Sequence, residues 1–525
     1  MIRTEDQWHG RVGAGAFRAI ALAVLAVLGQ AAYAQTEPPP GPEGRSMPQT
    51  GTQARQNLPS GAFFQPRVDA AVQYAQNFTL AEDGEPQVDM AGLELAPGFS
   101  ASYSSATTVG VIDYTLIGRA WEDSDYDDVS QRLAANGQWD AIPEWFYLTG
   151  QASYSDAIID PRFGINYGGM GIFGPGNLVE VGTAGISPVF QHRFGDWQAT
   201  LQYSYGRTWY FDEGRGEPVV GFGLDQDSID QAAGASFGTA DPDARFSARV
   251  FYDWQESEFE NALPYRYERA GFEGGYDIGR TLTLVGDVGV ESDLDASTTE
   301  GGLDSDFWSV GLRWRPSDRT TAEARVGERF FGDSWSGSIE HRARMLTFSA
   351  SYSEEPMVET QTLSLGEFDP GDLPPVLPGE GVGRFNSRPY VSRTARAVAR
   401  AEGARTMLSL DVYQEERDYL DLLSQDETNS GIRFRAARDL ASNLAGELEL
   451  SYTEYERAVG SPITDLELLA DDRDTQAILR FTRTTSPRLA FTAEAGYLMR
   501  NGEDDLGGAT DYDGFWVGLR AQWTP

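Results

Sequence analysis

The sequence predicts an all-β protein, a transmembrane antiparallel up-and-down β-barrel of about 22 strands within a range of 18–26. Three observations predict this fold. Apolar and polar residues alternate with a period of two, short and long connections alternate along the chain, and Trp residues recur beside the short connections. This combination is typical of barrels with tight turns at one end and long acidic loops at the other.

The composition agrees with a barrel wall. Hydrophobic residues make up 40% of the 525 residues, and the mean hydropathy is −0.41. A bundle of transmembrane helices would be far more apolar, whereas a barrel wall needs an apolar residue only at every second position. The aromatic content of 12% and the 58 Gly residues favour strands and turns.

The chain is strongly acidic. It contains 80 Asp and Glu against 41 basic residues, all of them Arg, which gives a net charge of −39. Such a chain repels phosphate, so nucleic acid is excluded as a partner. The charge suits a surface where Ca²⁺ or Mg²⁺ bridges acidic loops to anionic lipid; alternatively, the acidic residues only keep the loops solvated. The sequence has no Cys, so thiolate chemistry and Cys-ligated metals are excluded.

The N-terminus has the pattern of a signal peptide over residues 1–34. Three arginines precede the apolar run Ala19–Leu28, and Ala-Tyr-Ala at 32–34 forms a cleavage site. Residues 35–60 are rich in Pro, Gly and polar side chains, which indicates a disordered periplasmic lead-in. The barrel is expected over residues 61–525.

The alternation is clearest in four segments. Trp145–Ser155, Trp197–Tyr205, Leu346–Ser353 and Leu489–Met499 each place apolar residues on one face and polar or small residues on the other. This period is that of a half-buried strand.

The connections distinguish a barrel from a soluble sandwich, which has no reason to sort them by length. A connection at Gly332–Gly337 would be unusually short for the long-loop end. The predicted short links are Asp140–Glu144, Gly195–Asp196, Ala240–Asp243, Ile278–Arg280, Pro316–Arg319, Ala401–Ala404, Asp439–Ser442 and Thr485–Pro487. The predicted long links are Glu122–Ser130, Ala157–Asn177, Asp212–Asp227, Asp293–Ser305, Pro356–Arg388, Glu415–Glu427, Val459–Asp472 and Asn501–Asp511.

Trp residues beside the short links predict an aromatic girdle at one membrane interface, because indole prefers the headgroup region. The alternative is that they are ordinary core residues. The terminal segment Trp516–Trp523 resembles the last strand of such barrels, although two residues follow its final aromatic. The predicted girdle consists of Trp139, Trp145, Trp197, Trp314 and Trp523.

Charged residues alternate with apolar ones on several predicted strands, so they are expected to line a wet lumen. Around the link near position 441, Arg435 should face Glu447 and Arg433 should face Glu449. Around the link near 319, Arg315 should face Glu323, and Arg313 should face Arg325. The predicted lumen-lining set is Arg249, Arg313, Arg315, Glu323, Arg325, Arg329, Arg433, Arg435, Glu447 and Glu449.

These charges have two interpretations. Arg249, Arg313, Arg325 and Arg329 could form a positive wall that guides anionic solutes. Alternatively, the charges form cross-strand ion pairs that brace a wide barrel, which the Arg–Glu matches favour. Pro356–Arg388 could fold inward and constrict the lumen, or it could be an ordinary surface loop.

Catalytic motifs are absent, and we expect no enzyme and no cofactor. Nucleophilic hydrolysis would need a Ser beside His192 or His341, and Ser187 lies on the opposite strand face from His192. The run Asp123, Asp125, Asp127 and Asp128 suggests a loose Ca²⁺ site, but it lacks the Gly and Glu of an EF-hand. These residues are therefore not sufficient to assign a metal site.

Specific strings resemble a family of outer-membrane β-barrel proteins associated with the PEP-CTERM/exosortase system and exopolysaccharide genes. They are Ile186–Phe190, Arg193–Gly195, Gly311–Ser317, Gly327–Gly332 and His341–Arg344. The resemblance spans about Phe63 to Pro525. It implies a barrel in the outer membrane that is linked to exopolysaccharide biosynthesis or export, and it supplies no catalytic residues.

The expected function is a porin-like channel or export component in the outer membrane of a Gram-negative bacterium. A second hypothesis is a structural or surface-binding barrel with a plugged lumen and cation-bridging acidic loops. A third is a membrane-embedded hydrolase. The expected partners are outer-membrane lipid and lipopolysaccharide, the barrel assembly machinery and exopolysaccharide export components.

Overall fold

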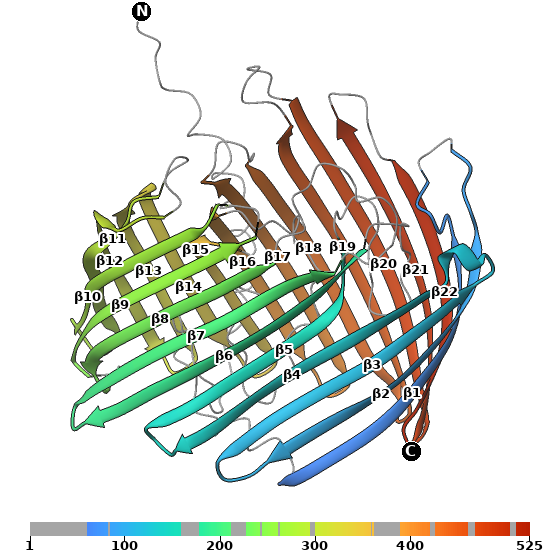
Figure 1. The fold of residues 1–525 in the computed structure, drawn as a ribbon, viewed down its shortest axis with the longest axis horizontal. Coiled ribbons are helices and arrows are strands. Elements are labelled where there is room, and N and C mark those ends of the chain that lie inside the picture. Colours follow the sequence, from blue (N-terminus) through green and yellow to red (C-terminus); the bar gives the residue numbers. More distant parts are fainter. Residues whose placement is uncertain are drawn as a thin grey trace, which may run out of the picture.

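The protein forms one closed β-sheet that wraps into a barrel (Figure 1). The structure is a computed structural model, and it describes residues 60–81, 85–158, 178–211, 227–241, 244–260, 263–294, 300–358, 360–361, 389–420, 426–459, 468–504 and 511–525. The predicted signal peptide and nearly all of the predicted lead-in lie outside these ranges. No helix in the described ranges is long and apolar enough to cross a membrane.

The sheet contains 22 strands, and one short 3-10 helix, η1 (Ser124–Tyr126), lies between β3 and β4. The strands are β1 (Gly61–Gln76), β2 (Met90–Ser104), β3 (Thr108–Trp121), β4 (Asp128–Ile142), β5 (Phe146–Ile158), β6 (Leu178–Phe194), β7 (Trp197–Phe211), β8 (Ser228–Thr239), β9 (Phe246–Phe259), β10 (Tyr265–Asp277), β11 (Leu282–Ser292), β12 (Leu303–Ser317), β13 (Thr320–Arg329), β14 (Gly332–Arg342), β15 (Leu346–Met357), β16 (Tyr390–Glu402), β17 (Thr406–Tyr419), β18 (Glu427–Ala441), β19 (Leu444–Val459), β20 (Leu468–Ser486), β21 (Leu489–Asp504) and β22 (Tyr512–Trp523).

Every strand pairs antiparallel with its neighbour in sequence, and β22 pairs back with β1 to close the sheet. This closing ladder, the seam, joins Val68–Gln76 to Phe515–Trp523. A closed sheet has no free edge, which is what a membrane-spanning sheet requires. The predicted fold class is therefore confirmed, including the strand count.

One ladder is shorter than the others. β14 and β15 share only six residue pairs within the described residues, from Gly337–Tyr352 to Arg342–Thr347. Beyond it, the Glu354 carboxylate accepts a hydrogen bond from the Trp335 backbone N–H at 3.1 Å. A side chain thus replaces a backbone acceptor where the two strands separate.

The connections are sorted by length, as predicted. Links after even-numbered strands are short and lie at one end of the barrel, the short-turn end; for example, Gly195 and Asp196 alone join β6 to β7. Gly195 has a φ of +65°, a conformation that glycine adopts without strain. Links after odd-numbered strands lie at the opposite, long-loop end.

The prediction of a connection at Gly332–Gly337 is wrong. The turn is formed by Phe330 and Phe331, and β14 begins at Gly332, whose φ is +105°. The Gly and Asp residues that follow this turn are typical of loops. Trp335, which lies among them, is nevertheless exposed on the apolar outer face of β14. The link is consequently the shortest one at its end among the described residues.

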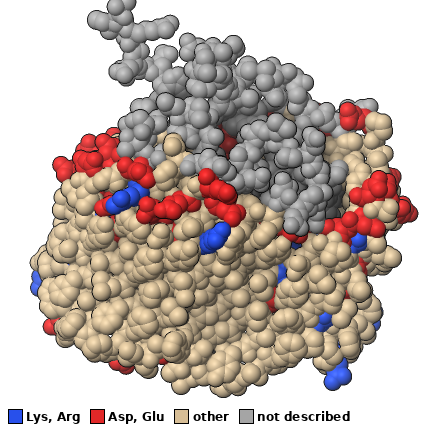
Figure 2. All heavy atoms as spheres, viewed as in Figure 1, with Lys and Arg blue, Asp and Glu red and all other residues tan. Residues whose placement is uncertain are grey.

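The outer face of the sheet is apolar. Large hydrophobic side chains alternate along the strands and are exposed, among them Val250 on β9, Leu312 on β12 and Leu519 on β22. Figure 2 shows this face as a broad belt almost free of charge, with acidic side chains gathered above it. So much exposed apolar area fits a sheet that faces lipid and not water.

An apolar cluster on the inner face covers the seam near the long-loop end. Trp516 on β22 and Trp121 on β3 belong to this cluster, and Phe78, from the link after β1, packs against Trp121 with tilted rings whose centroids are 4.4 Å apart. Leu498 and Tyr512 complete the contacts from β21 and β22. The cluster joins the first and last strands through side chains in addition to the backbone ladder.

Candidate functional site: the charged and polar lumen wall

The inner face of β9–β13 carries a continuous chain of ion pairs. Arg249 binds Glu273 at 2.8 Å, and Glu273 also binds Arg325 at 3.2 Å. Arg325 binds Glu323 at 2.6 Å, which in turn binds Arg313 at 2.5 Å. These residues alternate with lipid-facing apolar residues, so the strand period of two brings all five to one wall. Positive and negative charges alternate along this wall.

A more deeply buried cluster lies on the inner face near the long-loop end. Arg329 binds Glu291 at 2.9 Å, and both side chains are almost fully buried. Arg329 also donates to the Tyr267 hydroxyl at 2.7 Å and pairs with the half-exposed Glu355 at 3.1 Å. The Phe330 backbone N–H donates to Glu291 at 2.9 Å. A buried charge is tolerated because each of its polar atoms has partners.

A second chain of ion pairs runs over β18–β22. Glu447 lies between Arg435, at 3.0 Å, and Arg480, at 2.9 Å. Arg480 also binds Glu494 at 2.9 Å, and Glu494 accepts a hydrogen bond from the Trp516 indole at 3.0 Å. This chain of contacts therefore reaches the inner cluster at the seam.

Ion pairs also cross the seam itself. Arg520 on β22 lies 3.4 Å from Glu94 on β2, and Glu94 binds Arg119 on β3 at 3.1 Å. Arg119 continues to Asp128 on β4 at 3.2 Å. The seam is consequently bound on its inner face by charge and by apolar packing.

The predicted pairing around the link near 319 is wrong by two residues. Arg313, not Arg315, lies opposite Glu323, and Gly311 lies opposite Arg325. The register shifts between Trp314 and Ser317. The residues at this irregularity, which the prediction had counted as paired, have no direct partner in the ladder. Arg315 is exposed beside the turn.

Around the link near 441 the register also differs from the prediction by two. Arg435 lies opposite Glu449 and Arg433 opposite Ser451, with an irregularity between Asp439 and Ala441. The expected ion pairs nevertheless form along the diagonal, Arg435 with Glu447 and Arg433 with Glu449 at 3.8 Å. Long side chains reach diagonal neighbours across an antiparallel pair.

Neutral polar side chains line other parts of the inner face. On β14 and β15, Ser336, Ser351 and Ser353 are exposed to the interior. On β5–β7 the hydroxyls bind one another across strands, Ser153 with Thr183 at 2.7 Å and Ser187 with Ser204 at 2.8 Å. Further inward-facing amides and hydroxyls on β4–β8 are Asn136, Gln138, Thr149, Gln151, Thr200 and Gln202. Such groups both donate and accept hydrogen bonds.

All the Trp residues assigned to the girdle are exposed at the short-turn end. Trp197 begins β7, Trp523 ends β22, and Trp145 lies in the turn after β4. Trp139 and Trp314 lie on the outer face, opposite Leu148 and Ala322. Their level and their exposure are those of an interfacial aromatic girdle.

A second aromatic row, closer to the long-loop end than the girdle, was missed from the sequence. Outward-facing Tyr and Trp side chains of this row donate to polar groups on the next strand or link. The pairs are Tyr74–Asp89 at 2.8 Å, Tyr203–Gln231 at 2.7 Å, Tyr252–Glu268 at 3.1 Å, Trp308–Glu328 at 3.3 Å and Tyr497–Asp513 at 3.4 Å. The signal available in the sequence was an outward-facing aromatic residue with an acid or an amide on the adjacent strand or link.

Two aromatic rows that bound an apolar belt, on a closed barrel with tight turns at one end, are the architecture of outer-membrane barrels. The chain is therefore an outer-membrane β-barrel of a Gram-negative bacterium. The short-turn end is periplasmic and the long-loop end is external.

Acidic side chains gather at the external end (Figure 2). Burial raises the pKa of the Asp426 carboxyl, and the neighbouring carboxylate of Asp418 raises it further. The predicted Ca²⁺ run does not converge: Asp123 caps η1, Asp127 accepts from the Trp121 backbone N–H at 2.8 Å, and Asp128 pairs with Arg119. In the part of the chain that the structure describes, no three His, Asp or Glu side chains form a metal site.

The histidines do not form a nucleophilic site with Ser187. His192 packs on the outer face between Trp145 and Phe194, with ring centroids 3.8 and 4.2 Å away. His341 contacts the Thr320 hydroxyl at 2.8 Å. The predicted constricting loop, Pro356–Arg388, lies mostly outside the described residues.

No protein-family model and no curated protein sequence matches the chain. Among solved structures, the chain is similar to the siderophore receptor PirA from Acinetobacter baumannii, with 8% identity, coverage of 89% of this chain and 81% of that chain, and a TM-score of 0.48. The FrpB iron transporter from Neisseria meningitidis has 9% identity, coverage of 91% and 83%, and a TM-score of 0.40. OmpT of Vibrio cholerae has 10% identity, coverage of 88% and 97%, and a TM-score of 0.29. Since these scores lie below 0.5, the function proposed below rests on the residues of this chain.

Proposed function

We propose that the protein is an outer-membrane channel or export component for polysaccharide. The observation that carries this proposal is the chemistry of the lumen wall, where nearly every predicted lumen-lining charge is paired and the surfaces between are rich in hydroxyl and amide groups. Ser336, Ser351 and Ser353 are open to the interior. Hydroxyls and amides match the hydrogen-bonding groups of sugars, which both donate and accept.

The paired charges favour the bracing interpretation over a positive wall. Arg249, Arg313, Arg325 and Arg329, the candidates for that wall, each bind at least one carboxylate. Opposite charges paired at contact distance largely cancel each other's field, so such a wall acts weakly on a passing ion. It therefore suits an uncharged or weakly charged cargo better than a small anion. The resemblance to exopolysaccharide-associated barrels supports the same class of cargo.

Single-channel recording in planar bilayers tests the proposal. The purified protein should give stable conductance steps with weak ion selectivity, and added oligosaccharides should block the current reversibly. The Ser351→Phe variant should lower the conductance, because Ser351 faces the open interior. A folded protein that neither conducts ions nor responds to oligosaccharides would contradict a channel.

The acidic external end favours a second candidate, a structural or surface-binding barrel. Outward-facing Glu268 and Glu328 lie beside the external aromatic row, at the level of lipid headgroups. Divalent cations could bridge such carboxylates to the phosphates of lipopolysaccharide. A silent barrel whose binding to lipopolysaccharide vesicles is abolished by a chelator would support this candidate over the channel.

A further inference from the structure

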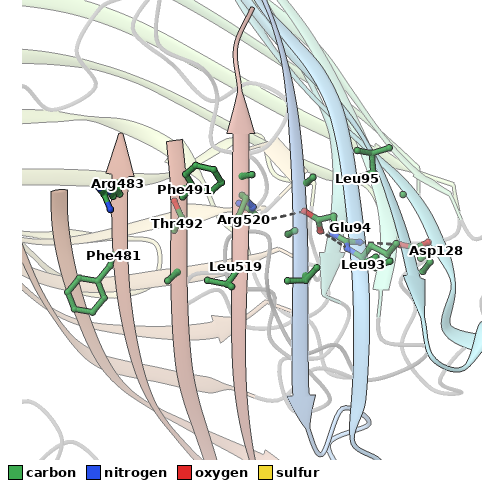
Figure 3. A pocket seen from close by; sticks show the side chains of 18 of the residues that line it. Leu93, Glu94, Leu95, Asp128, Phe481, Arg483, Phe491, Thr492, Leu519 and Arg520 are labelled. Atoms are coloured by element: carbon green, nitrogen blue, oxygen red, sulfur yellow. Dashed lines mark hydrogen bonds and ion pairs between the residues drawn. The ribbon is translucent and has the colours of Figure 1, made fainter. Parts of the chain in front are cut away.

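The outer face carries an apolar groove that crosses the seam. Its volume is about 900 Å³, and its lining comes from the strands β19–β22 and β1–β4 (Figure 3). These eight strands lie side by side, so seven spacings of about 4.8 Å give the groove a length of roughly 33 Å. It is therefore long enough to hold an extended acyl chain.

The groove faces lipid and not the lumen. Leu93, Leu95, Val129 and Leu519 line it and are each more than half exposed. The ion pair of Glu94 with Arg520 lies on the opposite side of the same strands. Because the wall is a single sheet, these two residues also contribute to the lining.

Small outward-facing residues create the hollow. In one row across the sheet, Ala521 lies between Phe491 on β21 and Ala70 on β1, and Ala70 lies opposite Leu95 on β2. The Ala side chains leave the backbone uncovered between the larger neighbours. An apolar surface shaped in this way accommodates a chain of methylene groups and not a single compact group.

One end of the groove carries a cation. Arg483 lies opposite Phe491 and Leu444, both of which face lipid, so its side chain is also on the outer face. It is exposed, and it makes no ion pair within the described residues. It lies three positions before Ser486, where β20 ends at the periplasmic end. An Arg at mid-membrane would cost ~2–4 kcal/mol, but near the interface it can reach a headgroup.

We propose that this groove binds an anionic phospholipid of the periplasmic leaflet, with its phosphate on Arg483 and its acyl chain along the apolar row. Guanidinium matches phosphate through two parallel hydrogen bonds. The charge lies at the depth of that leaflet's phosphates, and the apolar lining continues from it into the hydrocarbon layer. The proposal rests on the membrane location and is independent of whether the lumen conducts.

Native mass spectrometry of the protein extracted from vesicles tests the proposal. Vesicles contain equal amounts of phosphatidylglycerol and phosphatidylcholine, and the lipids that stay bound are counted. The wild-type protein should retain phosphatidylglycerol in preference, and Arg483→Gln should lower that preference by about fivefold. Arg280→Gln is the matched control, because Arg280 is also an exposed periplasmic Arg but lies in the turn after β10, far from the groove.

The groove is tested separately by Ala493→Phe, which fills it between Phe481 and Leu519 and leaves Arg483 in place. This variant should also lose bound lipid. Heat-modifiable mobility on gels verifies that each variant is folded. Equal retention of the two lipids by the wild type, or an equal effect of Arg483→Gln and Arg280→Gln, would overturn the proposal. The proposal would also be overturned if the wild-type protein formed dimers that Ala493→Phe dissociates, because the groove would then bind a second copy of the chain.

Discussion

Arg435 lies directly opposite Glu449 in the ladder between β18 and β19, yet its guanidinium binds Glu447 at 3.0 Å. Glu447 therefore forms ion pairs with two guanidinium groups, since Arg480 also binds it at 2.9 Å. Glu449 lies 3.8 Å from Arg433, which is also a diagonal contact. Diagonal contacts therefore contribute to the stability of this part of the wall.

Replacement of Glu447 by Gln should consequently destabilise the barrel more than the same change at Glu449. We expect a loss of about 1 kcal/mol for Glu447→Gln, because solvent in the lumen screens these partly exposed pairs. Glu449→Gln should have a smaller effect. Urea unfolding in lipid vesicles measures both, and equal midpoints would show that the diagonal contacts contribute nothing.

Glu291→Gln should be far more damaging. It removes the buried charge that neutralises Arg329, and breaking a buried pair costs about 3–5 kcal/mol. Glu355→Gln is the matched control, because Glu355 binds the same Arg329 but is half exposed. Its effect should be within about 1 kcal/mol. If the two variants unfold at the same urea concentration, burial does not govern the cost.

Gly496→Ala should loosen the seam. A Cβ at this position would lie 2.0 Å from the Trp516 ring, so the indole would have to leave the inner cluster. A Cβ at Gly150 would lie 3.8 Å from its nearest neighbour, so Gly150→Ala is a suitable control. Hydrogen exchange should rise in β1 and β22 only for Gly496→Ala, with a loss of about 3 kcal/mol or more. An unchanged exchange pattern would mean that the ladder alone closes the barrel.

Arg325→Gln should alter ion selectivity if the lumen conducts. Arg325 lies within ion-pair distance of Glu323, Glu273 and Asp287, at 2.6, 3.2 and 3.5 Å, so its loss removes one positive charge from among three carboxylates of the wall. The reversal potential in a salt gradient should shift toward cation preference, roughly a few-fold in permeability ratio. Arg483→Gln, on the lipid side, should leave selectivity unchanged. A shift toward anions would contradict the proposed balance of charge.

The strand count, the sorting of links and the facing of side chains could be predicted because each depends on a local pattern. Alternation in a segment such as Leu489–Met499 identifies both the strand and its outer face. The register could not be predicted, since one irregularity, as between Trp314 and Ser317, shifts every later pair. The pair Phe330 and Phe331 carries no turn signal, so the external link there was placed too late in the sequence.

The inner cluster and the lipid groove were beyond prediction for a different reason. Trp121 on β3 and Trp516 on β22 join one cluster only when the sheet closes and β1 pairs with β22. The groove likewise depends on Ala70 and Ala521, which come together across the seam. A sequence pattern records which face a residue occupies, but not which distant residue will lie beside it.

The six-pair ladder between β14 and β15 implies where the barrel will first open under stress. A closed ring of strands fails at the contact with the fewest hydrogen bonds, and here that contact lies in the second half of the chain and not at the termini. Opening there would leave a curved sheet in which β1 and β22 are still paired and lie away from both edges. The first and last strands would then stay paired with each other. Arg342 on β14 and Thr347 on β15, which lie opposite each other in the intact wall, would be on the two free edges of the sheet.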